Sequence, residues 1–119
     1  MNDLIMTLFL QEGTIVLNQG IIDALGRPNQ VQMLFDADSC QLLLRACGPD
    51  EEQVIVVGNE NMAEVAGQRL LKRISKRAKW DSDTTRYVYG VYLPDYNAVG
   101  FNMQDARPIS EMPGYEKLD

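Results

Sequence analysis

Residues 14–47 read TIVLNQGIIDALGRPNQVQMLFDADSCQLLLRAC. This stretch decides the fold because its helix, its strands and the turns between them can be assigned from the residue pattern. It predicts a strand over Thr14 to Leu17, a short helix over Gln19 to Leu25, and a hairpin with strands Val31 to Phe35 and Gln41 to Ala46. Asn18 is a typical helix N-cap, and Gly26 followed by Pro28 is a typical helix stop. The order is therefore strand, helix, strand, turn, strand.

The second half of the chain repeats this order of elements. Its predicted elements are a strand over Val54 to Val57, a helix over Ala66 to Trp80, and strands over Tyr87 to Tyr92 and Ala98 to Met103. Residue identity between the halves is slight, so the repeat is one of pattern, and both duplication and coincidence explain it. We expect one globular domain over residues 1–106, with pseudo-repeats 1–47 and 53–106 and a loosely held tail over 107–119.

Two apolar runs extend this prediction. Leu4 to Leu10 and the strand from Thr14 flank a turn that contains Gly13, which predicts a further hairpin. The consecutive residues Leu42, Leu43 and Leu44 predict a strand that is covered on both faces. The expected fold class is therefore α+β and β-rich, around one barrel-like core.

Composition places the chain among globular proteins and removes many enzyme mechanisms. It has 119 residues, of which 45% are hydrophobic and 24% charged, and a net charge of −6. It contains no histidine and two cysteines, Cys40 and Cys47, which excludes Cys/His zinc sites and histidine-based catalysis. A strand between the cysteines would hold them too far apart for a disulfide, so we expect reduced thiols.

The N-terminal segment indicates a cytoplasmic location. Its apolar run, Leu4 to Leu10, is short and has no basic region before it. It therefore matches neither a signal peptide nor a membrane span.

The first unit resembles the swapped-hairpin DNA-binding domains of AbrB-like regulators and MazE-like antitoxins. The resemblance rests on Ile15 to Asn18 at the end of the first strand, on the helix from Ile21 with its Leu25-Gly26 ending, and on the hairpin Val31 to Ala46. If the second half of the chain is a diverged copy of the first unit, the two units together are similar to the tandem arrangement of the MraZ-like branch. The resemblance implies two strand-helix-hairpin units in one swapped-hairpin barrel and a bacterial regulator that binds DNA. The helix Gln19 to Asp23 has no Arg or Lys, so no DNA-contacting residue of the family is carried over.

The most distinctive chemical feature is a basic segment between Gly67 and Trp80. Six of the eleven bases of the chain lie there without any acid, so the segment carries +6 and the remainder −12. These bases are Arg69, Lys72, Arg73, Lys76, Arg77 and Lys79. On a helix, Arg69, Arg73 and Lys76 share one face, with Lys72 and Lys79 beside it, opposite the apolar stripe of Leu70 and Ile74. DNA phosphates or an acidic protein surface can dock on this face. Alternatively, the basic face has no binding partner and is simply exposed to solvent, with its positive charge balanced by the acidic residues of the same chain.

Other residue clusters have ordinary structural explanations beside functional ones. The tyrosines from Tyr87 to Tyr96 can stack on single-stranded bases, but cross-strand packing explains them better. The pairs Asp36 with Asp38 and Asp81 with Asp83 can hold a metal, but turns and helix ends favour Asp for local hydrogen bonds. No glycine-rich phosphate loop occurs. We therefore expect a non-catalytic binding module that holds no cofactor or metal. It is expected to be a DNA-binding regulator or, alternatively, a protein-interaction module. A homodimer is a possible oligomeric state.

Overall fold

The computed structural model describes residues 3–47, 54–55, 57–59, 62–81 and 83–114. The first half contains β1 (Ile5–Phe9), β2 (Thr14–Asn18), α1 (Gln19–Ala24), β3 (Gln30–Asp36) and β4 (Gln41–Ala46). The second half contains β5 (Val54–Ile55), β6 (Val57–Asn59), β7 (Met62–Ala66), α2 (Gln68–Ala78), β8 (Arg86–Leu93) and β9 (Ala98–Asn102). Three short elements follow: the 3-10 helix η1 (Met103–Asp105), β10 (Arg107–Pro108) and the 3-10 helix η2 (Ile109–Glu111).

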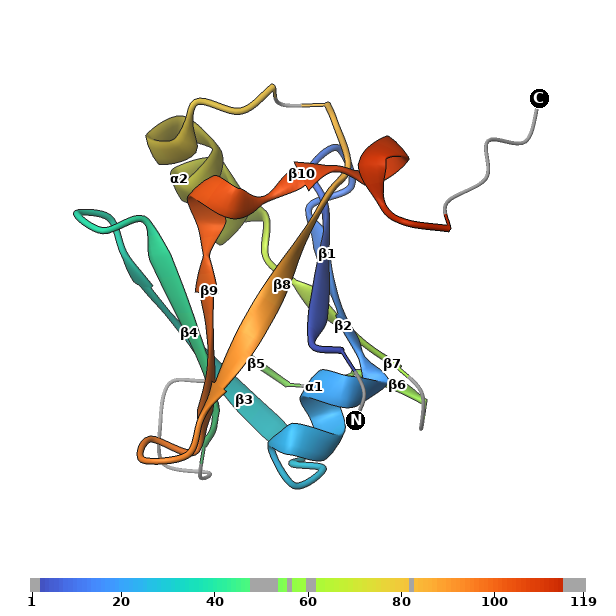
Figure 1. Ribbon diagram of the computed structural model, residues 1–119, viewed down its shortest axis with the longest axis vertical. Helices are drawn as coiled ribbons and strands as arrows, with labels where there is room; N and C mark the ends of the chain where they lie inside the picture. The colour runs from blue at the N-terminus through green and yellow to red at the C-terminus, as the bar shows by residue number, and fades with distance from the viewer. Residues whose placement is uncertain (1–2, 48–53, 56, 60–61, 82, 115–119) are drawn as a thin grey trace.

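All strands belong to one curled antiparallel sheet (Figure 1). The strand order is β5-β3-β4-β9-β8-β1-β2-β7-β6, and β10 pairs with β8 off this path. The two ends of the path, β5 and β6, are neighbours in the sequence, and β5 also lies next to β7. Because a trans peptide step spans about 3.8 Å, the two edges of the sheet must approach each other closely. The predicted β-rich character is confirmed, and the sheet is curled as in a half-barrel with few helices.

The concave face of the sheet holds the core. Alternate residues of β1, β2, β4 and β7 are buried, and β8 and β9 add further buried residues; the core includes Met6, Leu8, Ile15, Leu17, Leu42, Leu44, Val65, Val88, Val99 and Phe101. No polar or charged residue is buried among the described residues. The core is therefore held by apolar packing, with the backbone polar groups paired in the sheet.

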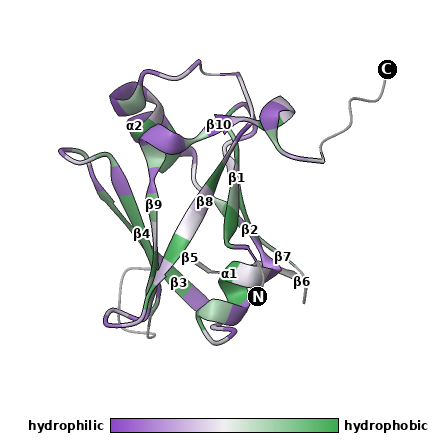
Figure 2. Ribbon diagram, in the orientation of Figure 1, coloured by the Kyte–Doolittle hydropathy of each residue, from purple (hydrophilic) through white to green (hydrophobic). Residues whose placement is uncertain are grey.

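The two helices lie at opposite ends of the curled sheet (Figure 1). Asn18 begins α1 as predicted, because its Oδ1 accepts hydrogen bonds from the backbone N–H groups of Ile21 and Ile5, each at 3.1 Å. The turns of α1 bury Ile21 and Ile22, and Gly26 follows the helix with a φ of 82°. Figure 2 shows mostly hydrophilic residues on α2, in contrast to α1.

The strand pairing has an approximate two-fold pattern. The strands that lead into the two helices, β2 and β7, pair antiparallel with each other, and so do β4 and β9, the second strands of the two hairpins. The counterpart of β2 is therefore β7, and not the run Val54 to Val57 that the sequence predicted. The pairing of β1 with β8 corresponds to that of β5 with β3. The hairpin loops 37–40 and 94–97 have equal lengths, and each ends in a left-handed residue, Cys40 with φ 56° and Asn97 with φ 47°.

Several expectations from the sequence need correction. The strand β7 was missed, and the helix that was expected from Ala66 begins at Gln68. The run expected as one strand over Val54 to Val57 contains β5 and the start of β6, with residue 56 outside the described residues. Leu43 faces the outer surface and is only half-buried, so β4 is not covered on both faces.

The segment assigned to a loosely held tail makes defined contacts in its described part. Arg107 and Pro108 pair with β8, and the backbone N–H of Ile109 donates to the carbonyl of Thr85 at 2.9 Å. Residues 115–119 lie outside the described part of the chain.

The close packing at Gly90 yields a stability prediction. A Cβ at Gly90 would lie 2.5 Å from Cε2 of Phe101 and 2.6 Å from Cγ1 of Val99, whereas a Cβ at Gly100 would meet Cδ1 of Leu93 at 3.2 Å. We expect Gly90→Ala to lower the free energy of unfolding by about 1–3 kcal/mol, because overpacked cores are strained. Gly100→Ala, on the outer face, should change it by less than about 1 kcal/mol. Urea denaturation measures both, and equal effects would contradict the described packing.

Candidate functional site

The basic segment forms the helix α2, as predicted, and its buried side fixes its orientation. Leu71 and Ile74 are buried against the core, while Leu70 and Ala78 are half-buried. Gly67 precedes the helix at a point where a Cβ would lie 2.8 Å from Cδ1 of Ile15. The start of α2 is therefore held tightly against β2.

All six predicted cationic residues lie on the exposed side of α2 or directly after it. At about 100° per residue, they occupy one continuous arc of roughly 160° around the helix. In order around this arc they are Lys79, Lys72, Lys76, Arg69, Arg73 and Arg77. We call this arc the cationic face.

One edge of the cationic face is bound to the β3–β4 hairpin. The Arg77 guanidinium donates from Nε to the carbonyl of Ala37 at 2.6 Å and from Nη2 to the carbonyl of Asp38 at 3.1 Å. The Arg73 guanidinium lies 5.9 Å from the ring centroid of Phe35, a cation–π distance. These two arginines therefore have a structural role that the sequence did not reveal.

The remaining cations make no such contacts. Within the described residues, Arg69, Lys72, Lys76 and Lys79 have no hydrogen bond or ion pair. The ion pairs of the described residues, Arg27 with Asp23 and Arg107 with Glu111, lie away from α2. Direct pairing with described acids therefore does not balance these four charges.

A groove runs beside the cationic face, between α2 and β3. It has a volume of about 690 Å³ and is lined by Met33, Ala66, Gly67, Gln68, Arg69, Leu70 and Arg73. The half-buried side chains of Met33 and Leu70 give it an apolar part, and two arginines border it. Met33 was not among the predicted site residues, and only the helix–strand contact reveals its position.

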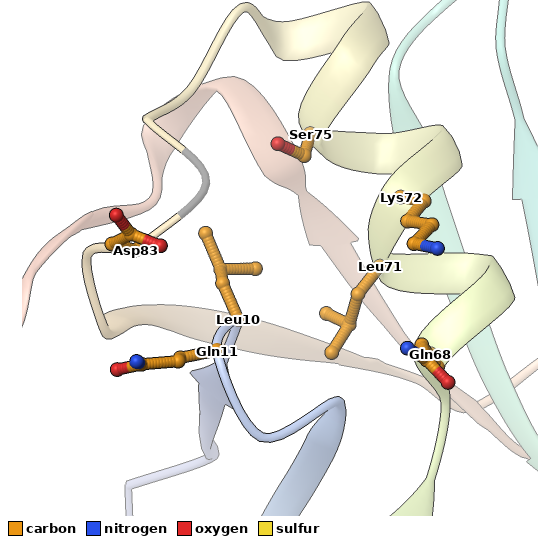
Figure 3. Close-up of a pocket in the computed structure, with 7 residues that line it drawn as sticks. All are labelled: Leu10, Gln11, Gln68, Leu71, Lys72, Ser75 and Asp83. Carbon is orange, nitrogen blue, oxygen red and sulfur yellow. The ribbon is translucent and has the colours of Figure 1, made fainter.

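A second, smaller pocket of about 230 Å³ lies on the other side of α2 (Figure 3). Leu10 and Leu71 face each other across its middle, while Lys72 and Asp83 lie on opposite sides of them. This arrangement separates the only opposite charges of the pocket, so they do not form an acid–base pair.

The other candidate residues serve local structure. Asp36 accepts hydrogen bonds from the backbone N–H of Asp38 at 3.2 Å and from Oγ of Ser39 at 2.8 Å, a turn role that the sequence predicted. Tyr87 packs edge-on against Tyr89 with ring centroids 5.7 Å apart. The described residues contain no cluster of three or more His, Cys, Asp or Glu side chains that is able to hold a metal ion. The acidic pair Asp81 and Asp83 is exposed.

The thiols are separate, as expected. Cys40 is buried at the end of the β3–β4 loop, Cys47 follows β4, and no disulfide joins them. Burial raises the pKa of the Cys40 thiol, and the nearby Arg77 guanidinium partly opposes this rise.

Comparison with known proteins adds no relative. No protein-family profile, curated protein or solved structure matches the chain. Among the described helices, none has the length and apolar character that a membrane crossing requires.

Arg77 is hydrogen-bonded to the β3–β4 loop and Lys76 is not, so neutralising each residue should change the stability of the protein by a different amount. Arg77→Gln removes both bonds to the β3–β4 loop, and we expect the free energy of unfolding to fall by about 1 kcal/mol. Lys76→Gln, one position earlier on the same helix, should change it by less than about 0.5 kcal/mol. Thermal unfolding monitored by circular dichroism compares the two, and a larger loss for Lys76→Gln would contradict the assignment.

The raised pKa of Cys40 predicts a loss of stability in alkali. In the unfolded chain the thiol ionises near its ordinary pKa of about 8.5, whereas in the folded protein it stays protonated to higher pH. The contribution of the Cys40 thiol to the free energy of unfolding is therefore complete below about pH 8.5 and is lost as the pH rises toward the pKa of the folded protein. We expect urea denaturation of the wild type to show a steeper stability loss above about pH 8.5 than Cys40→Ala. Identical pH profiles would show that the thiol does not contribute.

Proposed function

We propose that the protein is a non-catalytic bacterial binding module, an AbrB-like regulator that binds duplex DNA through the cationic face of α2. The observation that carries this proposal is the set of four exposed cations without an ion pair among the described residues. The absence of histidine from the sequence supports a non-catalytic role.

The strand pairing supports the swapped-hairpin part of the proposal. The β3–β4 hairpin of the first half pairs with β5 and β9 of the second half. Reciprocally, the β8–β9 hairpin pairs with β1 and β4 of the first half. This reciprocal pairing supports the swapped-hairpin arrangement that the AbrB-like resemblance implies, in the tandem, single-chain form proposed from the MraZ-like branch.

The dimensions of α2 suit a duplex. A helix of this length extends about 16 Å, and the major groove of B-DNA is about 12 Å wide and admits an α-helix. Arg69 and Lys76 lie two turns apart near the middle of the arc, where they reach neighbouring phosphates. Because the rest of the chain carries −12, the approach of DNA is favoured only from the α2 end.

An acidic protein is the second candidate partner, and one observation favours it. The groove beside the cationic face combines Met33 and Leu70 with Arg69 and Arg73. A DNA backbone offers only its sugar carbons to the apolar part of such a groove, whereas an acidic protein segment with an apolar side chain fits both parts.

The DNA proposal predicts a salt-dependent affinity that depends on the unpaired cations. The logarithm of the binding constant should fall linearly with the logarithm of salt concentration, because bound phosphates release counterions. Arg69→Gln with Lys76→Gln should weaken binding and reduce this slope by roughly 1.8, about 0.9 per lost phosphate contact. Fluorescence anisotropy with a labelled random-sequence duplex measures the slope.

The matched control neutralises two cations elsewhere. Arg27 and Arg107 are exposed and are paired with Asp23 and Glu111, so their change to Gln alters the net charge equally. This control should leave the slope unchanged. Absence of duplex binding at low salt would reject DNA and leave the acidic protein partner.

A further inference from the structure

The outer face of the β3–β4 and β8–β9 hairpins carries a straight apolar row. Leu34 pairs with Leu43, Leu43 with Gly100, and Gly100 with Val91, so the four residues lie side by side across four strands. Leu34 is 44% exposed and Val91 64% exposed. The row is thus contiguous, with exposed residues at its two ends and the half-buried Leu43 and Gly100 between them.

Neighbouring residues widen this row into a patch. Tyr89 and Leu93 lie on β8 with the same alternation as Val91, and Tyr89 is 47% exposed. A hollow of about 350 Å³ is lined by Leu34, Leu43, Leu93 and Gly100 together with the polar residues Asp36, Ser39 and Gln41. Scattered exposed apolar residues are ordinary, whereas the largest contiguous apolar patch of a monomer is often functional.

We propose that this face binds the same face of a second copy of the chain in a two-fold dimer. Two charged residues flank the row on opposite sides. Asp36 lies two residues beyond Leu34 toward the β3–β4 loop, and Arg45 lies two residues beyond Leu43 in the opposite direction. A two-fold axis along the row exchanges these sides, so that Arg45 of each copy approaches Asp36 of the other.

This charge arrangement selects a second copy as the occupant. An isologous interface must be complementary to itself, and an opposite pair on the two sides of the axis meets this requirement. The row itself is uncharged, so the net charge of −6 on each chain does not oppose contact there directly. Arg45 also donates to Oε1 of Gln32 at 2.9 Å, which holds its side chain on this outer face.

The available area fits only a weak, reversible dimer. Four strands at about 4.8 Å and six residues at about 3.3 Å give a face of roughly 19 by 20 Å. Two such faces bury on the order of 760 Å² in total, which is below the standard range of about 1,200–2,000 Å² and in the class of weak, transient contacts. The dimer should therefore dissociate on dilution.

Analytical ultracentrifugation of the complete chain without DNA tests the proposal. The wild type should shift from monomer to dimer between low micromolar and high micromolar concentrations. Leu34→Lys should raise the dissociation constant at least about tenfold, because it places a charge in the apolar row. Met62→Lys is the matched control, since Met62 on β7 is 43% exposed and lies outside the patch. It should leave the dissociation constant unchanged.

A charge exchange tests the two-fold orientation. Arg45→Glu alone should raise the dissociation constant, and combination with Asp36→Lys should restore it to within about threefold of the wild type. Circular dichroism verifies that each variant is folded. A monomeric wild type throughout the range, an unaffected Leu34→Lys, or a failure of the folded double variant to restore dimerisation would each overturn the proposal. These results do not depend on DNA, so they stand apart from the test of DNA binding.

Discussion

The antiparallel pairing of β2 with β7 is the constraint on which the rest of the structure depends. It joins the two halves at strands that each lead directly into a helix. Because Asn18 pairs with Met62 and Thr14 with Ala66, the chain leaves the two strands at opposite ends of the pair. The helices α1 and α2 must therefore begin at opposite ends of the curled sheet. This places the apolar α1 and the cationic α2 far from each other.

The first half of the chain could be predicted almost completely, because its local signals and its tertiary contacts agree. Asn18 caps α1, and the hairpin strands have nearly the expected ends. The strand β7 was missed because Ala63, Glu64 and Ala66 have weak strand propensity. In the fold, Ala63 and Val65 face the core and β7 pairs on both sides, so the tertiary context overrides the local preference.

The candidate site was predictable as a face and unpredictable in its details. Helical periodicity alone separates the cations from Leu71 and Ile74. The contacts of Arg77 with Ala37 and Asp38 join residues about forty positions apart, and they depend on where the β3–β4 loop meets α2. A similar limit applies to β4, because the sequence of Leu42, Leu43 and Leu44 does not show which of these side chains is on the outer face of the sheet. The pairing partners and the curl of the sheet decide that Leu43 faces outward.

The segregation of charge has a physical consequence for the molecule as a whole. A cluster of +6 at one end of a body that otherwise carries −12 gives the protein a large electric dipole moment. In a uniform or slowly varying field the molecule experiences a torque, even where the net force on it is repulsive. At physiological ionic strength a charged surface acts over only about 8 Å, the Debye length, so it interacts with the end of the molecule that faces it and not with the net charge of the whole. The protein should therefore be retained by both anionic and cationic chromatography surfaces, with a different end toward each.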